Sequence, residues 1–198
     1  MTKNVDKLMW MLLHDLRTPL NVVQEGLREL WEVGMDPAVA DLIAKGTLQI
    51  TTALDFVQTT LDLLKDKSAD GVYVPLRQIA ERLRHEGERF HVPISVELAG
   101  EPDVPVAFRA APTAFVLVSL AAVAPEVEPL SLERIDEPER LRVRRPSGWS
   151  FLGDLSKERL LSLRPGYAAW ALAELPAVRG VVMSIEGDSL ILTIPRAD

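Results

Sequence analysis

The sequence contains no cysteine, which excludes disulfide bonds, thiolate catalysis and cysteine-based zinc sites. Basic residues are in the minority, since the formal net charge is −7, and we therefore expect no nucleic-acid partner. No uninterrupted apolar run approaches the roughly 18 residues that a membrane-spanning helix needs. The first twenty residues, MTKNVDKLMWMLLHDLRTPL, lack the small-residue cleavage site of a signal peptide. We therefore expect a cytoplasmic protein with no membrane-bound part.

Residues 1–66 have the pattern of two long helices joined by a short turn. In each half, apolar residues recur at spacings typical of helices that pack in a coiled coil or bundle. Gly34 predicts the end of the first helix, and Asp36 and Pro37 predict the N-cap and first turn of the second. The two apolar stripes comprise Val5, Met9, Leu12, Leu16, Val23 and Leu30, followed by Ile43, Ile50, Leu54, Val57, Leu61 and Leu64.

A single helical hairpin has little surface against which to bury these stripes, whereas two copies of it form a four-helix bundle. We therefore predict a homodimer in which residues 1–66 are the dimerisation unit. The alternative is that the stripes pack against the C-terminal part of the same chain.

The pattern changes after residue 66. A polar stretch, residues 67–73, predicts a linker, and residues 74–198 predict an α+β domain, an α/β sandwich of helices and largely antiparallel strands. Gly187 and Asp188 predict the turn of a hairpin. The expected elements are a helix at 76–90, a strand at 94–98 with 104–108 paired near it, a helix at 113–124, a loop at 125–138, a strand at 140–144, a helix at 166–175 and hairpin strands at 181–185 and 189–194.

One short segment, LHDLRTPL at residues 13–20, has a pattern tied to known chemistry. It resembles the phospho-acceptor box of sensor histidine kinases, whose usual form is a histidine, an acidic residue, a leucine and then Arg-Thr-Pro-Leu. The resemblance implies that His14 accepts a phosphoryl group and that Asp15 orients the imidazole and accepts its proton. It also implies that Thr18 aims a water molecule in members with phosphatase activity. Pro19 removes one backbone donor from the predicted helix and should kink it.

The chemistry of these residue types is consistent with the resemblance. A neutral imidazole nitrogen is a nucleophile near neutral pH. Arg17 and Thr18 follow His14 by three and four residues, which on a helix places them near the same face. The guanidinium of Arg17 would therefore place a fixed positive charge beside an incoming phosphoryl group.

The second part of the chain resembles the ATP-binding domain of the same kinases in plan, but not in its motifs. Residues 115–124 resemble the asparagine-rich helix that holds Mg²⁺, yet Ser119 and Val123 stand at the two asparagine positions. Valine has no oxygen to offer this hard cation. No Asp-x-Gly-x-Gly motif occurs anywhere, residues 141–149 fall near its place, and the lid is reduced to residues 165–167. We expect no ATP binding and no cofactor of the chain's own, with Mg²⁺ supplied by a partner receiver domain.

Other candidate residues give weaker signals. His85 and His91 form no metal-ligand spacing with His14, and we interpret them as surface or structural residues. Trp149 and Trp170 are interpreted as packing residues rather than a ligand cage. An arginine cluster suits either a phosphate or acidic partner or a solvated edge strand whose like charges discourage pairing, and we favour the edge strand. The cluster is Arg140, Arg142, Arg144 and Arg145.

These observations lead to a first hypothesis and two alternatives. The first is a phosphorelay histidine phosphotransferase of a two-component system, which moves a phosphoryl group between His14 and the aspartates of response-regulator receiver domains. The alternatives are an active histidine kinase with a divergent ATP site, and a non-catalytic pseudokinase that binds a receiver or a kinase. Receiver phosphatase activity that depends on Thr18 is compatible with the first hypothesis. The expected partners are a second copy of the chain and receiver domains, with a histidine kinase as a further candidate.

Overall fold

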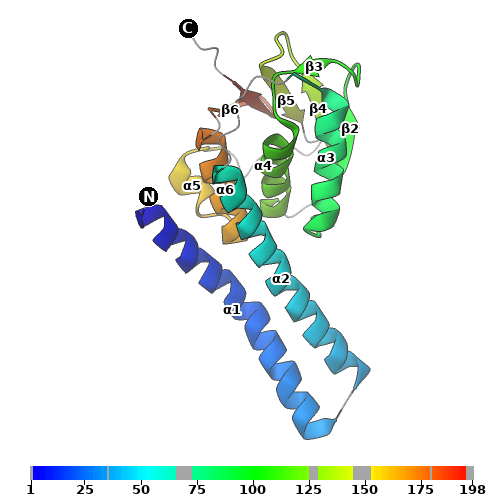
Figure 1. Cartoon of the computed structure of the whole chain (residues 1–198), viewed down its shortest axis with the longest axis vertical. Helices are drawn as coiled ribbons and strands as arrows, with labels where there is room; N and C mark the ends of the chain where they lie inside the picture. Colours follow the sequence, from blue (N-terminus) through cyan, green and yellow to red (C-terminus); the bar gives the residue numbers. More distant parts are fainter. Residues whose placement is uncertain are drawn as a thin grey trace.

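The computed structural model describes residues 2–34, 36–65, 73–124, 129–144, 153–178 and 180–194. The chain folds as a helical hairpin that leads into a mixed α/β region (Figure 1). This arrangement confirms the expected fold class. In the part of the chain that these ranges cover, no helix is both long and apolar enough to cross a bilayer.

The hairpin consists of α1 (Thr2–Val33) and α2 (Pro37–Lys65), which run side by side in opposite directions (Figure 1). Gly34 ends α1 with a φ of +93°, a backbone conformation that glycine adopts without strain. Asp36 caps α2, since its Oδ1 accepts a hydrogen bond of 2.7 Å from the backbone N–H of Ala38. The predicted helix boundary at residues 34–37 is confirmed.

Two glycines let the helices of the hairpin approach each other closely. A Cβ atom at Gly26 would lie 2.6 Å from Cγ1 of Ile43, and one at Gly46 would lie 2.7 Å from Cγ2 of Val23. Contacts this short do not occur between real atoms, so a larger residue at either position would push the helices apart. The two helices therefore form a tight unit within one chain.

Part of the apolar stripe of α1 packs against the same chain, whereas a second copy was expected to cover it. Leu12 and Leu16 are buried in one continuous core with Phe56 of α2 and with the C-terminal domain. The ring of Phe56 lies 4.6 Å from the ring of Phe115, between centroids, and 5.1 Å from that of Tyr167. The alternative in which the stripes pack on the same chain is thus correct for the end of the hairpin nearest the domain. The stripe from which the dimer was inferred is covered there without a second copy.

The C-terminal region contains a five-stranded sheet of strand order β2-β4-β5-β7-β6, in which only the β2–β4 pair is parallel. The predicted hairpin about Gly187 is confirmed as β6 and β7. A separate two-stranded sheet pairs β1 with β3. The strands are β1 (Val74–Pro75), β2 (Ser95–Leu98), β3 (Pro105–Val106), β4 (Pro129–Arg134), β5 (Arg140–Arg144), β6 (Val182–Glu186) and β7 (Ser189–Thr193).

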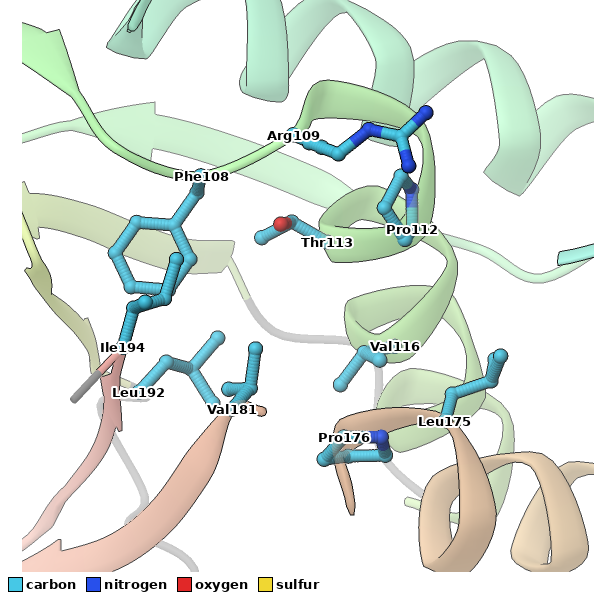
Figure 2. Close-up of a pocket in the computed structure, with 10 residues that line it drawn as sticks. All are labelled: Phe108, Arg109, Pro112, Thr113, Val116, Leu175, Pro176, Val181, Leu192 and Ile194. Atoms are coloured by element: carbon cyan, nitrogen blue, oxygen red, sulfur yellow. The ribbon is translucent and has the colours of Figure 1, made fainter. Parts of the chain in front are cut away.

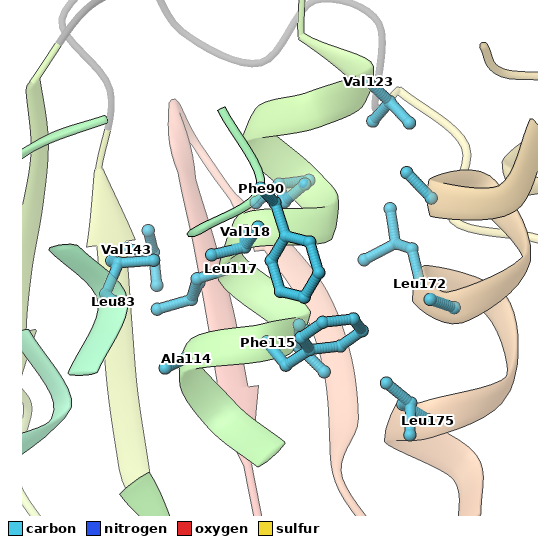
Figure 3. Close-up of a cluster of buried hydrophobic side chains, with 14 of the residues drawn as sticks. Leu83, Phe90, Ala114, Phe115, Leu117, Val118, Val123, Val143, Leu172 and Leu175 are labelled. Atoms are coloured by element: carbon cyan, nitrogen blue, oxygen red, sulfur yellow. The ribbon is translucent and has the colours of Figure 1, made fainter. Parts of the chain in front are cut away.

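The sheet is covered by helices that share the core with the hairpin. Figure 3 shows α4 between the strands and α6, with the rings of Phe90 and Phe115 meeting edge to face at 5.4 Å. Trp170 of α6 is buried in this core, as expected of a packing residue; Trp149 lies outside the described residues. The helices are α3 (Leu76–Arg89), α4 (Ala110–Val123), α5 (Lys157–Leu160) and α6 (Gly166–Val178).

Two local predictions in this region are wrong, and one predicted helix begins earlier than expected. Part of the expected loop at 125–138 is strand β4, whose alternating Leu130 and Leu132 face the core. The segment at 104–108 contributes β3, which pairs with β1 instead of lying beside the strand at 94–98. The helix expected at 113–124 begins at Ala110, so that Pro112 falls in its first turn, where no backbone donor is needed.

The arginine-rich strand β5 is not an edge strand, because it lies between β4 and β7. Its arginines are compensated by acidic residues of neighbouring strands and turns. The shortest contacts join Arg140 to Glu186 at 2.8 Å and Arg142 to Glu133 at 2.8 Å, while Arg144 lies 3.4 Å from Asp188. Arg145 lies outside the described residues, as does most of the predicted linker at 67–73, of which only Tyr73 is described.

Candidate functional site

His14 lies on the exposed side of α1, near the end of the hairpin that meets the C-terminal domain. Its side chain is 54% exposed, so a partner can reach the imidazole. The indole of Trp10, one turn earlier on the helix, lies 5.7 Å from the imidazole between ring centroids. Trp10 is itself exposed, which leaves both rings on an open surface.

Asp15 connects His14 to the C-terminal domain. Its Oδ1 lies 3.5 Å from Nδ1 of His14, and its Oδ2 accepts a hydrogen bond of 3.1 Å from the backbone N–H of Tyr167. The carboxylate is only 10% exposed. A carboxylate at the first turn of a helix satisfies an unpaired N–H and faces the positive end of the helix dipole. Asp15 therefore caps α6 while it faces the imidazole.

Gly166 makes this contact possible. A Cβ atom at residue 166 would lie 2.9 Å from Oδ2 of Asp15 and 3.1 Å from Cε of Met11. Any other residue would displace the start of α6 from α1. The neighbouring phenol of Tyr167 is also affected, because burial, and then the charge of Asp15, raise the pKa of Tyr167 above its usual value of 10.0.

A cleft of about 520 Å³ opens at this junction. Its lining is drawn from α1, α2, the segment before α6 and the first turn of α6, so that neither half of the molecule forms it alone. The residues of the phospho-acceptor box that line it are His14, Asp15, Thr18 and Pro19, and those from elsewhere are Gln49, Ala53, Arg164, Pro165 and Tyr167.

The structure brings together most, but not all, of the predicted site residues. His14, Asp15 and Thr18 share the cleft, whereas Arg17 is exposed and is not among its lining residues. Helix α1 continues through Pro19 without interruption; a kink there stays a prediction. Arg164 is the cation that lines the cleft. It lies far along the chain from His14, so the spacing of residues in the sequence could not identify it.

Ser119 and Val123, which stand at the positions of the two kinase asparagines, do not form a metal site. The hydroxyl of Ser119 is fully buried and donates a hydrogen bond of 2.7 Å to the carbonyl of Phe115, one turn back on α4. Val123 is buried and has no side-chain oxygen. Neither residue fits a magnesium-bound nucleotide. His85 and His91 are exposed, in agreement with their interpretation as surface residues.

A second cavity lies at the start of α4 and is much smaller. Figure 2 shows it between the start of α4, the end of α6 and the last strands, with mainly apolar side chains around it. Its volume of about 20 Å³ is room for about one water molecule. The cleft beside His14 is therefore the stronger candidate for a functional site.

Comparison with known proteins identifies the fold. No family model and no curated protein matches the sequence. Among solved structures, a histidine kinase of Acinetobacter baumannii, AdeS, is similar over 92% of this chain and 98% of its own, with a TM-score of 0.61 and 14% identity. A bacterial phosphotransferase is similar over 96% of this chain and 95% of its own, with a TM-score of 0.50 and 15% identity. The chain therefore has a histidine-kinase-like fold, as the phospho-acceptor box implied.

Proposed function

We propose that this chain of histidine-kinase-like fold is a histidine phosphotransferase of a two-component system. It accepts a phosphoryl group on His14 from the aspartate of one response-regulator receiver domain and passes it to another. The observation that supports this most directly is the arrangement of His14 and Asp15. An exposed imidazole lies in a cleft, with a carboxylate oxygen 3.5 Å from its Nδ1. This geometry leaves Nε2 as the nucleophile.

The transfer step follows from this arrangement. In the tautomer with a proton on Nδ1, the lone pair of His14 Nε2 forms the new bond to phosphorus. The bond from phosphorus to the receiver's aspartate oxygen breaks, and its electron pair stays on that oxygen as a carboxylate. The ring gains positive charge, which the carboxylate of Asp15 stabilises by taking up the Nδ1 proton. The reverse step returns the proton and the phosphoryl group.

The chain's own residues favour a receiver over ATP as the donor. Ser119 and Val123 give Mg²⁺ no ligand, so we derive no step through a nucleotide. A receiver domain brings its own aspartate and Mg²⁺, and the hairpin needs only to position His14 against them. Thr18 lines the cleft beside His14, and we assign to it a role in orienting water if the protein also dephosphorylates receivers.

A homodimer is part of this proposal, through a face of α1 other than the one first inferred. Exposed large apolar residues follow α1 at spacings of seven, seven and four, which is typical of the seam of a coiled coil. Neither α2 nor the C-terminal domain covers this face of α1, and a second copy placed on it would complete a four-helix bundle. These residues are Leu13, Leu20, Leu27 and Trp31.

A pair of labelling experiments tests the function. The protein is mixed with labelled ATP and Mg²⁺, and separately with receiver domains phosphorylated by labelled acetyl phosphate. We expect acid-labile label only from a receiver, and none in His14→Ala. Label from ATP would instead indicate an active kinase. Release of inorganic phosphate without labelled protein would indicate a phosphatase, and binding without transfer a pseudokinase.

A further inference from the structure

The cleft beside His14 contains a cation that the phospho-acceptor box does not supply. Arg164 lies in the segment that leads into α6, and it lines the cleft together with His14 and Asp15. The side chain is exposed. Nη1 of Arg164 donates a weak hydrogen bond of 3.4 Å to the neighbouring carbonyl of Leu163, so the guanidinium retains most of its donors for a ligand.

The guanidinium of Arg164 and the carboxylate of Asp15 both border the space beside Gly166. The point where a Cβ of Gly166 would stand is 3.3 Å from Nη1 of Arg164 and 2.9 Å from Oδ2 of Asp15. Across the residues that the structure describes, no carboxylate is within ion-pair distance of Arg164. By contrast, the arginines of β5 all have acidic partners, for example Arg142 with Glu133 at 2.8 Å.

A phosphorylated His14 would need such a cation. A phosphoryl group brings a charge of about −1.5 to −2 at neutral pH and three strong acceptor oxygens, and Asp15 alone would repel it. A guanidinium binds phosphoryl oxygens with two parallel N–H donors, which fixes their orientation as well as their charge. Arg17 does not line the cleft, so we do not assign the binding of the phosphoryl group to it.

We propose that Arg164 is a phosphoryl-binding residue of the His14 site, contributed by the C-terminal domain. This inference rests on the proposed function, because it requires a phosphoryl group on His14. In this arrangement Asp15 positions the imidazole and caps α6, while Arg164, three residues before the capped N–H of Tyr167, holds the phosphoryl oxygens during transfer. Arg164 directly precedes residues 165–167, so the segment that leads into α6 acquires a role at the hairpin.

The test compares Arg164→Ala with Arg159→Ala, an exposed arginine of α5 that does not line the cleft, using two donors. Phosphoramidate is a chemical donor that needs no partner protein, and a phosphorylated receiver domain is the second donor. We expect Arg164→Ala to lower the rate of His14 phosphorylation by about 10- to 100-fold with both donors, less than the loss of a buried oxyanion donor because Arg164 is exposed. Arg159→Ala should stay within about 3-fold of the wild type with both donors, since surface substitutions away from the site have small effects. Arg164→Lys should recover only part of the rate, because it keeps the charge but loses the paired donors.

The outcomes separate this inference from the proposed function. If Arg164→Ala slows only the receiver reaction, the residue contacts the partner and not the phosphoryl group, and the inference is overturned. Equal rates for wild type and Arg164→Ala with both donors also overturn it, while the phosphotransferase stands. If wild-type protein forms no phosphohistidine with either donor, the proposed function itself fails. Circular dichroism of each variant identifies any loss of rate that comes from unfolding.

Discussion

At the scale of single residues, Asp15 has two roles that its sequence context did not reveal together. The phospho-acceptor box predicts a carboxylate beside the histidine, and the 3.5 Å contact to Nδ1 of His14 agrees with this. The bond from Tyr167 N–H to the other oxygen joins residues 152 positions apart, which no local pattern encodes. The same holds for Arg164, whose place in the cleft depends on how the domain sits against the hairpin. Sequence reasoning therefore selected His14 as the candidate nucleophile and missed the residues that the fold brings to it.

The two roles of Asp15 can be separated by substitution. Asp15→Asn keeps an oxygen that can accept from Tyr167 N–H but loses the charge, whereas Asp15→Ala loses both. We expect both variants to slow phosphorylation of His14, because neither can take up the ring proton. Only Asp15→Ala should lower the free energy of unfolding by the roughly 1–2 kcal/mol of a lost helix cap. Denaturant unfolding and phosphoramidate labelling measure the two effects. Equal loss of stability in both variants would show that charge, not the cap, matters for folding.

At the scale of elements, local patterns predicted the helices well and the sheet only in part. The helices carry long periodic stripes and clear boundary residues, such as Asp36 and Pro37. Strand β4 was missed because Pro129 begins it and Pro138 follows it closely, although its alternating leucines match a strand. The place of β5 in the centre of the sheet follows from pairing with β7, nearly fifty residues later, and its arginines gave no sign of this because their acidic partners come from other strands.

The contact between α6 and α1 gives a prediction at the same scale. In an unconstrained helix, Gly166→Ala would be neutral or stabilising, since alanine favours helices by about 1 kcal/mol over glycine. Here the new Cβ would stand 2.9 Å from Asp15 Oδ2, so we expect destabilisation by about 1–3 kcal/mol. The double variant Asp15→Ala, Gly166→Ala removes the clash and should cost less than the sum of the single changes. Chemical denaturation of the four proteins measures this coupling. Simple additivity would mean that Asp15 and residue 166 do not interact.

At the scale of the whole molecule, the hairpin and the C-terminal domain share one core through Phe56, Phe90 and Phe115. The domain therefore rests on the hairpin close to His14, with its Arg164 in the cleft. A receiver that docks at His14 would meet both parts of the chain. The comparison by fold alone could not reveal this, because similarity at 14% identity reports the arrangement of elements and not the side chains at their junction.

The state of assembly is the remaining property of the whole molecule, and the exposed seam of α1 makes it testable. If a second copy covers this face, a charge in its middle would be buried without a partner on association, at a cost of several kcal/mol. We therefore expect Leu20→Asp, and more strongly the pair Leu20→Asp and Leu27→Asp, to convert a dimer into a monomer.

Val182→Asp is the control, because Val182 is a similarly exposed apolar residue on β6, away from the hairpin. Light scattering coupled to gel filtration measures the mass of each variant. A wild-type mass of one chain at high micromolar concentration, or a Leu20→Asp variant that stays dimeric, would contradict the proposed seam. Leu20 follows His14 by six residues, which on a helix places the two side chains about 120° apart, so a folded monomer should still be labelled by phosphoramidate.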